Sequence, residues 1–119
     1  MINLILIETY NAYSITVKGS MNTKKYAKIF KALSNQNRLE LYLQIVKKSE
    51  ASFATDHECL ISEIIDSFKI GAPTISHHLK ELANAELIFT EKKGKFLVCR
   101  VNEALVQEVV TLLRLQGED

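Results

Sequence analysis

The sequence predicts a mainly α-helical domain that carries one β-hairpin. Apolar residues recur at helical spacing in several separate segments. Ahead of the last of these segments, two apolar runs at 87–91 and 95–101 flank Lys92-Lys93-Gly94, which is typical of a tight hairpin turn. Two helices, a helix-turn-helix, a hairpin and a final helix then follow one another in the order of a winged helix-turn-helix.

The first two helices are expected to start near residues 23 and 34. Thr23 is placed to cap the first helix. Its apolar face contains Tyr26, Ile29, Phe30 and Leu33. Ser34 starts the second helix, in which the same spacing recurs at Leu39, Tyr42, Leu43 and Val46. Both faces must pack against other elements, so these two helices supply part of a core.

The helix-turn-helix is expected at 61–85. Its first helix has a short apolar face of Ile61, Ile64, Ile65 and Phe68. The turn follows at 69–71, and the second helix spans 72–85, because Pro73 is tolerated in a first helical turn. After the hairpin, Asn102 can cap a last helix. Its apolar stripe consists of Leu105, Val106, Val109, Val110, Leu112 and Leu113.

Charge is segregated along the chain, although the net charge of the 119 residues is only +1. Residues 21–48 contain seven basic residues and one acidic residue, whereas residues 49–66 contain five acidic residues and neither Lys nor Arg. A nearly neutral protein of this kind can still present one positive face to nucleic acid. Charged helix faces that only face solvent are equally compatible with the pattern.

One face of the predicted helix at 72–85 has the chemistry of DNA recognition. At about 100° per residue, Ile75, Leu79 and Leu82 point to the core. The opposite face is polar and contains Thr74, Ser76, His77 and Lys80. His78 lies at the boundary, where it would contact phosphate or brace the helix. Hydroxyl, imidazole and ammonium groups can all bind base edges in the major groove, while a polar face that is merely solvated is the alternative.

Basic residues also surround the predicted hairpin tip. Lys92, Lys93 and Lys95 would lie along the DNA backbone, or serve only to keep the tip soluble. Arg38, near the start of the second helix, would reach phosphate or pair with an acid in the fold. We therefore expect His77 to influence sequence preference and Lys93 to contribute affinity for every sequence alike.

Several classes of protein are disfavoured by the sequence. The two cysteines, Cys59 and Cys99, are too few for a disulfide-stapled secreted scaffold. No run reaches the roughly 18 apolar residues of a membrane span, and residues 1–7 lack the basic leader of a signal peptide, so we expect a cytoplasmic protein. The sequence also lacks a glycine-rich phosphate loop, a metal-ligand cluster and a Ser/His/Asp arrangement, and an enzyme is not expected.

Residues 1–20 differ from the rest of the chain. They are β-prone, and Lys18-Gly19-Ser20 can be encoded by a purine-rich run resembling a bacterial ribosome-binding site just before Met21. Two interpretations stay open, a translated leader ahead of a true start at Met21 and a genuine N-terminal arm. In both cases, residues 21–119 are expected to form the DNA-binding and dimerisation domain.

Three segments resemble the ArsR/SmtB family of bacterial winged-helix repressors. Residues 30–39, FKALSNQNRL, are similar to the family's opening segment. Residues 73–80, PTISHHLK, are similar to its recognition helix, and residues 91–101 to its wing. The resemblance covers residues 24–113. It implies a homodimeric transcriptional repressor that binds double-stranded DNA at an inverted-repeat operator.

The resemblance also implies that the first and last helices, 24–33 and 103–115, pair across the dimer. The expected dimer contacts are Tyr26, Ile29, Phe30, Leu105, Val109, Leu112 and Leu113. The apolar stripe of the last helix agrees with this, because it is broader than one small core would cover.

The sequence departs from the family pattern at the DNA and at the metal sites. Ala72 stands where the family often has Gln, and His77 replaces the usual Arg, so the operator preference of relatives does not carry over. Residues 60–62 lack the thiol pair of metal-sensing members, and the last helix contains no His. The four adjacent residues 56–59 are poorly spaced to surround a tetrahedral ion. We expect neither a metal nor another cofactor.

Two further hypotheses about function stay open. If the segment before the third helix pairs with the second wing strand, Cys59 approaches Cys99. A disulfide between them, which needs Cα atoms within about 7 Å, would make a thiol-based redox-sensing repressor; two ordinary buried thiols are the alternative. The winged helix could also serve as a protein–protein interaction module.

Overall fold

The computed structural model describes residues 22–51 and 58–114. The helices are α2 (Thr23–Leu33), α3 (Gln36–Glu50), α4 (Ser62–Ile65), α5 (Ala72–Asn84) and α6 (Glu103–Arg114), and the strands are β1 (Cys59–Leu60), β2 (Ile88–Lys93) and β3 (Phe96–Val101). The choice between leader and arm for residues 1–20 lies outside the described residues, as do Asp56 and His57. In the described ranges, no helix is long and apolar enough to cross a membrane.

The three strands form one antiparallel sheet in the order β1-β3-β2. β2 and β3 are the wing hairpin, and β1, which precedes α4, pairs with the second wing strand, which was the condition for bringing Cys59 close to Cys99. The turn lies one residue later than predicted, because Gly94 supplies the positive φ of 65° and Lys93 still pairs with Phe96. The predicted winged helix-turn-helix is confirmed.

The helix starts differ from the predicted ones. Asn22 and Asn35 are the N-caps of α2 and α3, and their side-chain oxygens accept backbone N–H groups of the first turns at 3.0 and 2.9 Å. The predictions for Thr23 and Ser34 were wrong, because a strong asparagine cap stands beside each of them. Thr23 is the first residue of α2, and the Ser34 hydroxyl instead donates to a backbone carbonyl at the end of α2.

The first helix of the helix-turn-helix is shorter than predicted. α4 occupies only Ser62–Ile65, and the Ser67 hydroxyl donates to the Ile64 carbonyl at 2.7 Å. A serine side chain that bonds to the backbone in this way competes with the helical hydrogen bonds. The remaining apolar residues predicted for this helix still pack on the core, with Phe68 partly buried.

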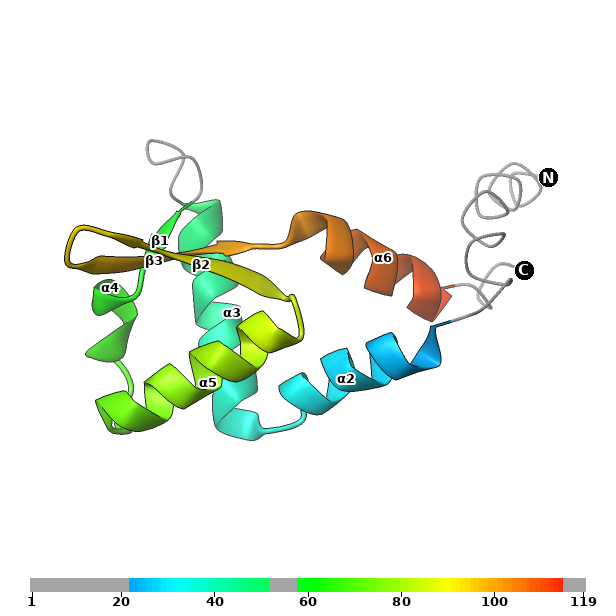
Figure 1. The fold of residues 1–119 in the computed structure, drawn as a ribbon, viewed down its shortest axis with the longest axis horizontal. Helices are drawn as coiled ribbons and strands as arrows, with labels where there is room; N and C mark the ends of the chain where they lie inside the picture. Colours follow the sequence, from blue (N-terminus) through cyan, green and yellow to red (C-terminus); the bar gives the residue numbers. More distant parts are fainter. Residues whose placement is uncertain (1–21, 52–57, 115–119) are drawn as a thin grey trace.

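A single core unites α2, α3, α5 and the inner face of the sheet. Its largest fully buried side chains are Ile29, Leu41, Ile45, Ile64, Ile75, Leu82, Ile88, Cys59 and Cys99. α5 lies below the sheet, and α2 and α6 lie together at the end of the molecule opposite the wing (Figure 1). The fold therefore separates the wing and the helix-turn-helix from the paired helices α2 and α6.

Candidate nucleic-acid interface

The exposed face of α5 contains the four residues that the sequence assigned to it. Thr74, Ser76, His77 and Lys80 are all exposed. They face outward because the opposite face of α5 is buried in the core, where Ile75 is 1% and Leu79 is 5% exposed. The arrangement presents two hydroxyls, an imidazole and an ammonium group on one side of a regular helix.

His78 does not belong to this exposed set. Its side chain is 5% exposed, and its Nδ1 lies 3.4 Å from Nη1 of Arg38. Arg38 also donates from Nε to the Ala32 carbonyl at 2.6 Å. Because arginine only donates, the His78 ring accepts at Nδ1 and bears its proton on Nε2. Of the two roles considered for His78, this geometry favours bracing α5 against the ends of α2 and α3.

Burial is the main cause that lowers the pKa of His78, and the charges of Arg38 and His77 add to it. The neutral ring is therefore the form that suits its site, since a cation there would lose hydration beside another cation. The contact that holds α5 depends on the ring remaining neutral.

The wing cations are unequal. Lys93 Nζ donates to Glu58 Oε2 at 2.7 Å, and Nη2 of Arg100 lies 3.5 Å from the same oxygen. The hydrogen bond from Lys93 is the main cause that lowers the pKa of Glu58. Lys92 and Lys95 are exposed beside this cluster. Lys93, which the sequence placed on the DNA backbone, thus has a carboxylate partner already.

The two cysteines are directly opposed across β1 and β3. Opposed residues of an antiparallel pair have Cα atoms about 4.5–5.5 Å apart, within reach of a disulfide, but both thiols are free. Cys59 and Cys99 are 1% and 0% exposed. Burial is the main cause that raises the pKa of Cys59 to about 11 and that of Cys99 to about 12. Protonated, enclosed thiols are poorly suited to rapid oxidation.

The residues expected at a dimer interface fall into two groups. Tyr26, Ile29 and Leu105 are 6%, 1% and 4% exposed within one chain, so they already belong to its own core. Phe30 and Leu113 are 40% and 65% exposed. The others, Val109 and Leu112, are partly buried.

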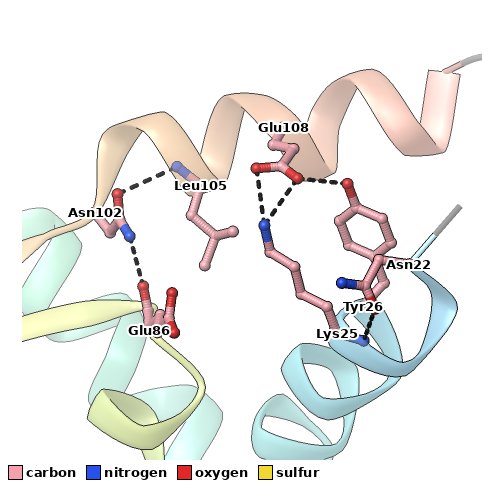
Figure 2. A network of polar contacts seen from close by, with 7 residues as sticks. All are labelled: Asn22, Lys25, Tyr26, Glu86, Asn102, Leu105 and Glu108. Atoms are coloured by element: carbon pink, nitrogen blue, oxygen red, sulfur yellow. Dashed lines mark hydrogen bonds and ion pairs between the residues drawn. The ribbon is translucent and has the colours of Figure 1, made fainter. Parts of the chain in front are cut away.

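A polar contact that the sequence did not reveal holds α2 to α6. Tyr26 donates its hydroxyl hydrogen to Glu108 at 2.5 Å, and Lys25 Nζ lies 3.0 Å from the same carboxylate (Figure 2). The bond from Tyr26 is the main cause that lowers the pKa of Glu108, while burial is the main cause that raises the pKa of Tyr26 to about 12. Charge and hydrogen bonding therefore link the two helices through partly exposed side chains.

Comparisons with known proteins agree with this arrangement. Residues 53–89 match the family described as "Bacterial regulatory protein, arsR family". The chain is 32% identical over 100 residues to the arsenical resistance operon repressor of Bacillus subtilis, which covers 80% of this chain and 88% of the relative. The chain belongs to the arsR family. It is also 30% identical over 82 residues to the transcriptional repressor SdpR of the same organism, covering 69% and 81% of the two chains.

Solved structures share the fold of this arsR-family protein. A crystal structure of an ArsR family transcriptional regulator superposes with a TM-score of 0.65 at 21% identity, covering 81% of this chain and 90% of that one. HlyU from Vibrio cholerae gives a TM-score of 0.60 at 21% identity, covering 82% and 96%. The resemblance drawn from three sequence segments is confirmed, and the protein is a DNA-binding transcriptional regulator rather than an enzyme.

Metal ligands are not clustered in the part of this arsR-family protein that the structure describes. Groups of three or more His, Cys, Asp or Glu residues placed to hold an ion are absent from residues 22–51 and 58–114. Glu58, which the sequence considered as a ligand and set aside, is engaged by the wing cations instead.

We predict that Cys59 and Cys99 react slowly in the folded protein. Raising a thiol pKa from 9.0 to about 11 lowers the thiolate fraction near pH 8 by about 100-fold, and burial blocks access as well. Ellman's reagent should titrate neither thiol quickly in buffer and both in urea. Rapid native reaction, or DNA binding that changes reversibly with oxidant in wild type but not in a Cys59→Ser, Cys99→Ser variant, would restore the redox-sensor hypothesis.

We predict that His78 makes stability fall as the pH drops below about 6.5. Its folded pKa lies below its ordinary value of 6.5, so the unfolded chain binds more protons in that window and the free energy of unfolding decreases with falling pH. Urea denaturation at pH 7.5 and 5.5 measures the effect. A His78→Gln variant should be less stable at pH 7.5 but lose less on acidification, whereas the exposed His77→Gln control should behave as wild type. An unchanged pH dependence in His78→Gln would contradict the assignment.

Proposed function

We propose that this arsR-family regulator is a homodimeric, cytoplasmic repressor that reads an inverted-repeat operator with α5. The observation that carries the proposal is the two-sided character of α5. One side is locked into the core through Ile75, Leu79 and Leu82, and the other presents only polar side chains at its centre. A helix of this kind fits the major groove, where its N-terminal half meets base edges.

Base reading is assigned to Thr74, Ser76, His77 and Lys80. These four are exposed in the first two and a half turns of α5. Hydroxyls and imidazole donate or accept, and a lysine can pair with guanine or phosphate. His78 and Arg38 act indirectly in this proposal, because their contact adds to the core packing that sets the rotation of α5.

Backbone binding is assigned to the wing, chiefly to Lys92 and Lys95. Both are exposed and flank the tip at Gly94. Lys93 contributes less, because the Glu58 carboxylate offsets its charge at 2.7 Å. Neutralising phosphates with lysines gives affinity that weakens steeply with salt and does not depend on sequence.

Dimerisation is assigned to the outer faces of α2 and α6. The exposed apolar residues there are Phe30, Val110 and Leu113. Val109 and Leu112 pack partly against the core and contribute only the area that they leave exposed. Exposed apolar side chains on two helices that the Glu108 contacts link suit a symmetric interface with a second copy. Such a dimer places two copies of α5 on one face of the duplex.

The signal is proposed to be something other than a metal bound at the usual family sites. Residues 60–62 and α6 lack the ligands that the family resemblance would require. The names of the relatives from Bacillus subtilis and Staphylococcus aureus refer to arsenical resistance, but residues 60–62 of this chain lack the thiol pair that the family resemblance implies for metal-sensing members.

We predict separate effects on specificity and on general affinity. Fluorescence anisotropy on the chain's own upstream DNA should give tight, salt-dependent binding that scrambled DNA lacks. His77→Ala should reduce discrimination between the two DNAs, because a base contact is worth about 1–3 kcal/mol. Lys92→Ala should weaken both DNAs alike and lower the salt slope by about 1, and Lys93→Ala should do so less.

The outcomes separate two functions. Uniform losses in both His77→Ala and Lys92→Ala would contradict the division between base and backbone contacts. Weak binding to every DNA at low salt would instead favour a winged helix that docks on a protein, whose apolar contacts respond little to salt.

We predict that Leu113→Asp converts the protein to monomers. The change places a charge within the proposed interface, at the most exposed apolar residue of α6, and an unpaired buried charge is strongly unfavourable. Sedimentation velocity gives the mass directly. Leu43→Asp is the matched control, because Leu43 is 55% exposed on α3 and lies outside the proposed interface. A dimer that survives Leu113→Asp, or equal dissociation of both variants, would contradict this interface.

A further inference from the structure

Asn102 joins the end of α5 to the start of α6 (Figure 2). Its backbone N–H donates to the Leu87 carbonyl at 3.0 Å, and its Nδ2 donates to the Glu86 carbonyl at 2.8 Å. On the other side, its Oδ1 accepts from the N–H of Leu105 at 3.3 Å, and its carbonyl accepts from the N–H of Val106 at 3.1 Å. Two polar groups thus bind the turn after α5, and two begin α6.

The turn that Asn102 binds is itself tightly fixed. The N–H of Leu87 donates to the Leu82 carbonyl at 3.0 Å and that of Glu86 to the Ala83 carbonyl at 2.9 Å, which is the Schellman pattern at the end of a helix. Glu86 has a φ of 65°, a conformation that side chains other than glycine rarely adopt. Strained backbone of this kind persists where its surroundings hold it, and the Asn102 amide is part of them.

The contacts of Asn102 with Glu86 and Leu87, which we call the joint, connect the two functional parts of the molecule. α5 carries the proposed base contacts, and α6 carries part of the proposed dimer surface. α6 is 12 residues long, so it extends about 18 Å from the joint. A rotation of about 10° at the joint therefore moves the far end of α6 by about 3 Å, close to the 3.4 Å between successive bases of one strand.

We propose that Asn102 is a positioning residue that sets which spacing between operator half-sites the dimer accepts. Its amide binds the Glu86 turn and so adds to the packing of Leu105 on the core in holding α5 at one angle to α6. Two copies of α5 in a symmetric dimer then lie at one separation, and half-sites one base pair closer or farther apart fit less well. The inference rests on the proposed dimeric, inverted-repeat function and adds a residue that determines its spacing.

The test separates two roles of the Asn102 side chain, the bond from its amide to Glu86 and the N-cap that its oxygen provides for α6. Asn102→Ser keeps an N-cap oxygen for Leu105, because serine caps about as well as asparagine, but removes the amide that binds Glu86. Asn102→Asp also keeps the cap and replaces the donor with a carboxylate. Asn22→Ser is the matched control, since Asn22 caps α2 through the same atom. Anisotropy of the full chain on duplexes with half-site spacings changed by one or two base pairs, and on a single half-site, gives the readout.

Wild type and Asn22→Ser should prefer one spacing by about tenfold, within the range usual for coupling between two sites. Asn102→Ser and Asn102→Asp should lower that preference to about twofold while single half-site affinity and the dimer mass stay unchanged. A retained spacing preference in both variants, or equal loss on every duplex, would overturn the inference. Wild-type binding without any spacing preference would overturn it too, whereas failure of wild type to select its own DNA would overturn the proposed function first.

Discussion

The structure depends on the burial of one face of α5. Ile75, Leu79 and Leu82 are 1%, 5% and 0% exposed, and each such side chain stabilises the fold by about 1.5–3 kcal/mol. A single hydrogen bond contributes about 0.5–1.5 kcal/mol net. Burial therefore decides how α5 is rotated, and the polar contacts only refine it. Because the apolar positions are fixed, the exposed positions 74, 76, 77 and 80 are fixed with them.

On the wing, ion pairs rather than burial determine which charged side chains are available to DNA. Glu58 directly precedes β1, and its carboxylate forms ion pairs with Lys93 of β2 and Arg100 of β3. These ion pairs connect the wing to the segment before α4. The Glu58 carboxylate also offsets positive charge on the surface that faces the DNA backbone in our proposal. Lys92 and Lys95 are exposed to either side of the tip at Gly94. Although the net charge of the chain is only +1, the folded structure therefore distributes charged side chains unevenly over the wing.

Periodicity predicted most of the fold, and it missed mainly the contacts between residues that lie far apart in the sequence. The 3.6-residue spacing in 72–85 identified both the buried and the exposed face of α5, since a helix face depends on one segment alone. Glu58 and Lys93 are 35 positions apart and Tyr26 and Glu108 are 82 apart, so those contacts depend on packing between elements. Asn22 and Asn35 were missed for a local reason, because a second good cap stood beside each predicted one. The β1–β3 pairing of Cys59 was anticipated, but its burial belongs to the assembled core.

The joint at Asn102 is where a signal could act on this fold. α5 cannot rotate about its own axis without exposing Leu82, and α2 and α6 are held together by the Glu108 contacts. α2 and α5 share one core, so the angle that depends most on polar contacts is that of α6, which is bound at the Glu86–Asn102 contact and at Glu108. In our proposal, a ligand or partner that releases operator DNA favours a different angle of α6, since only a difference in binding between two states can shift their populations. The same contact would then determine both how the dimer fits its operator and how it is released.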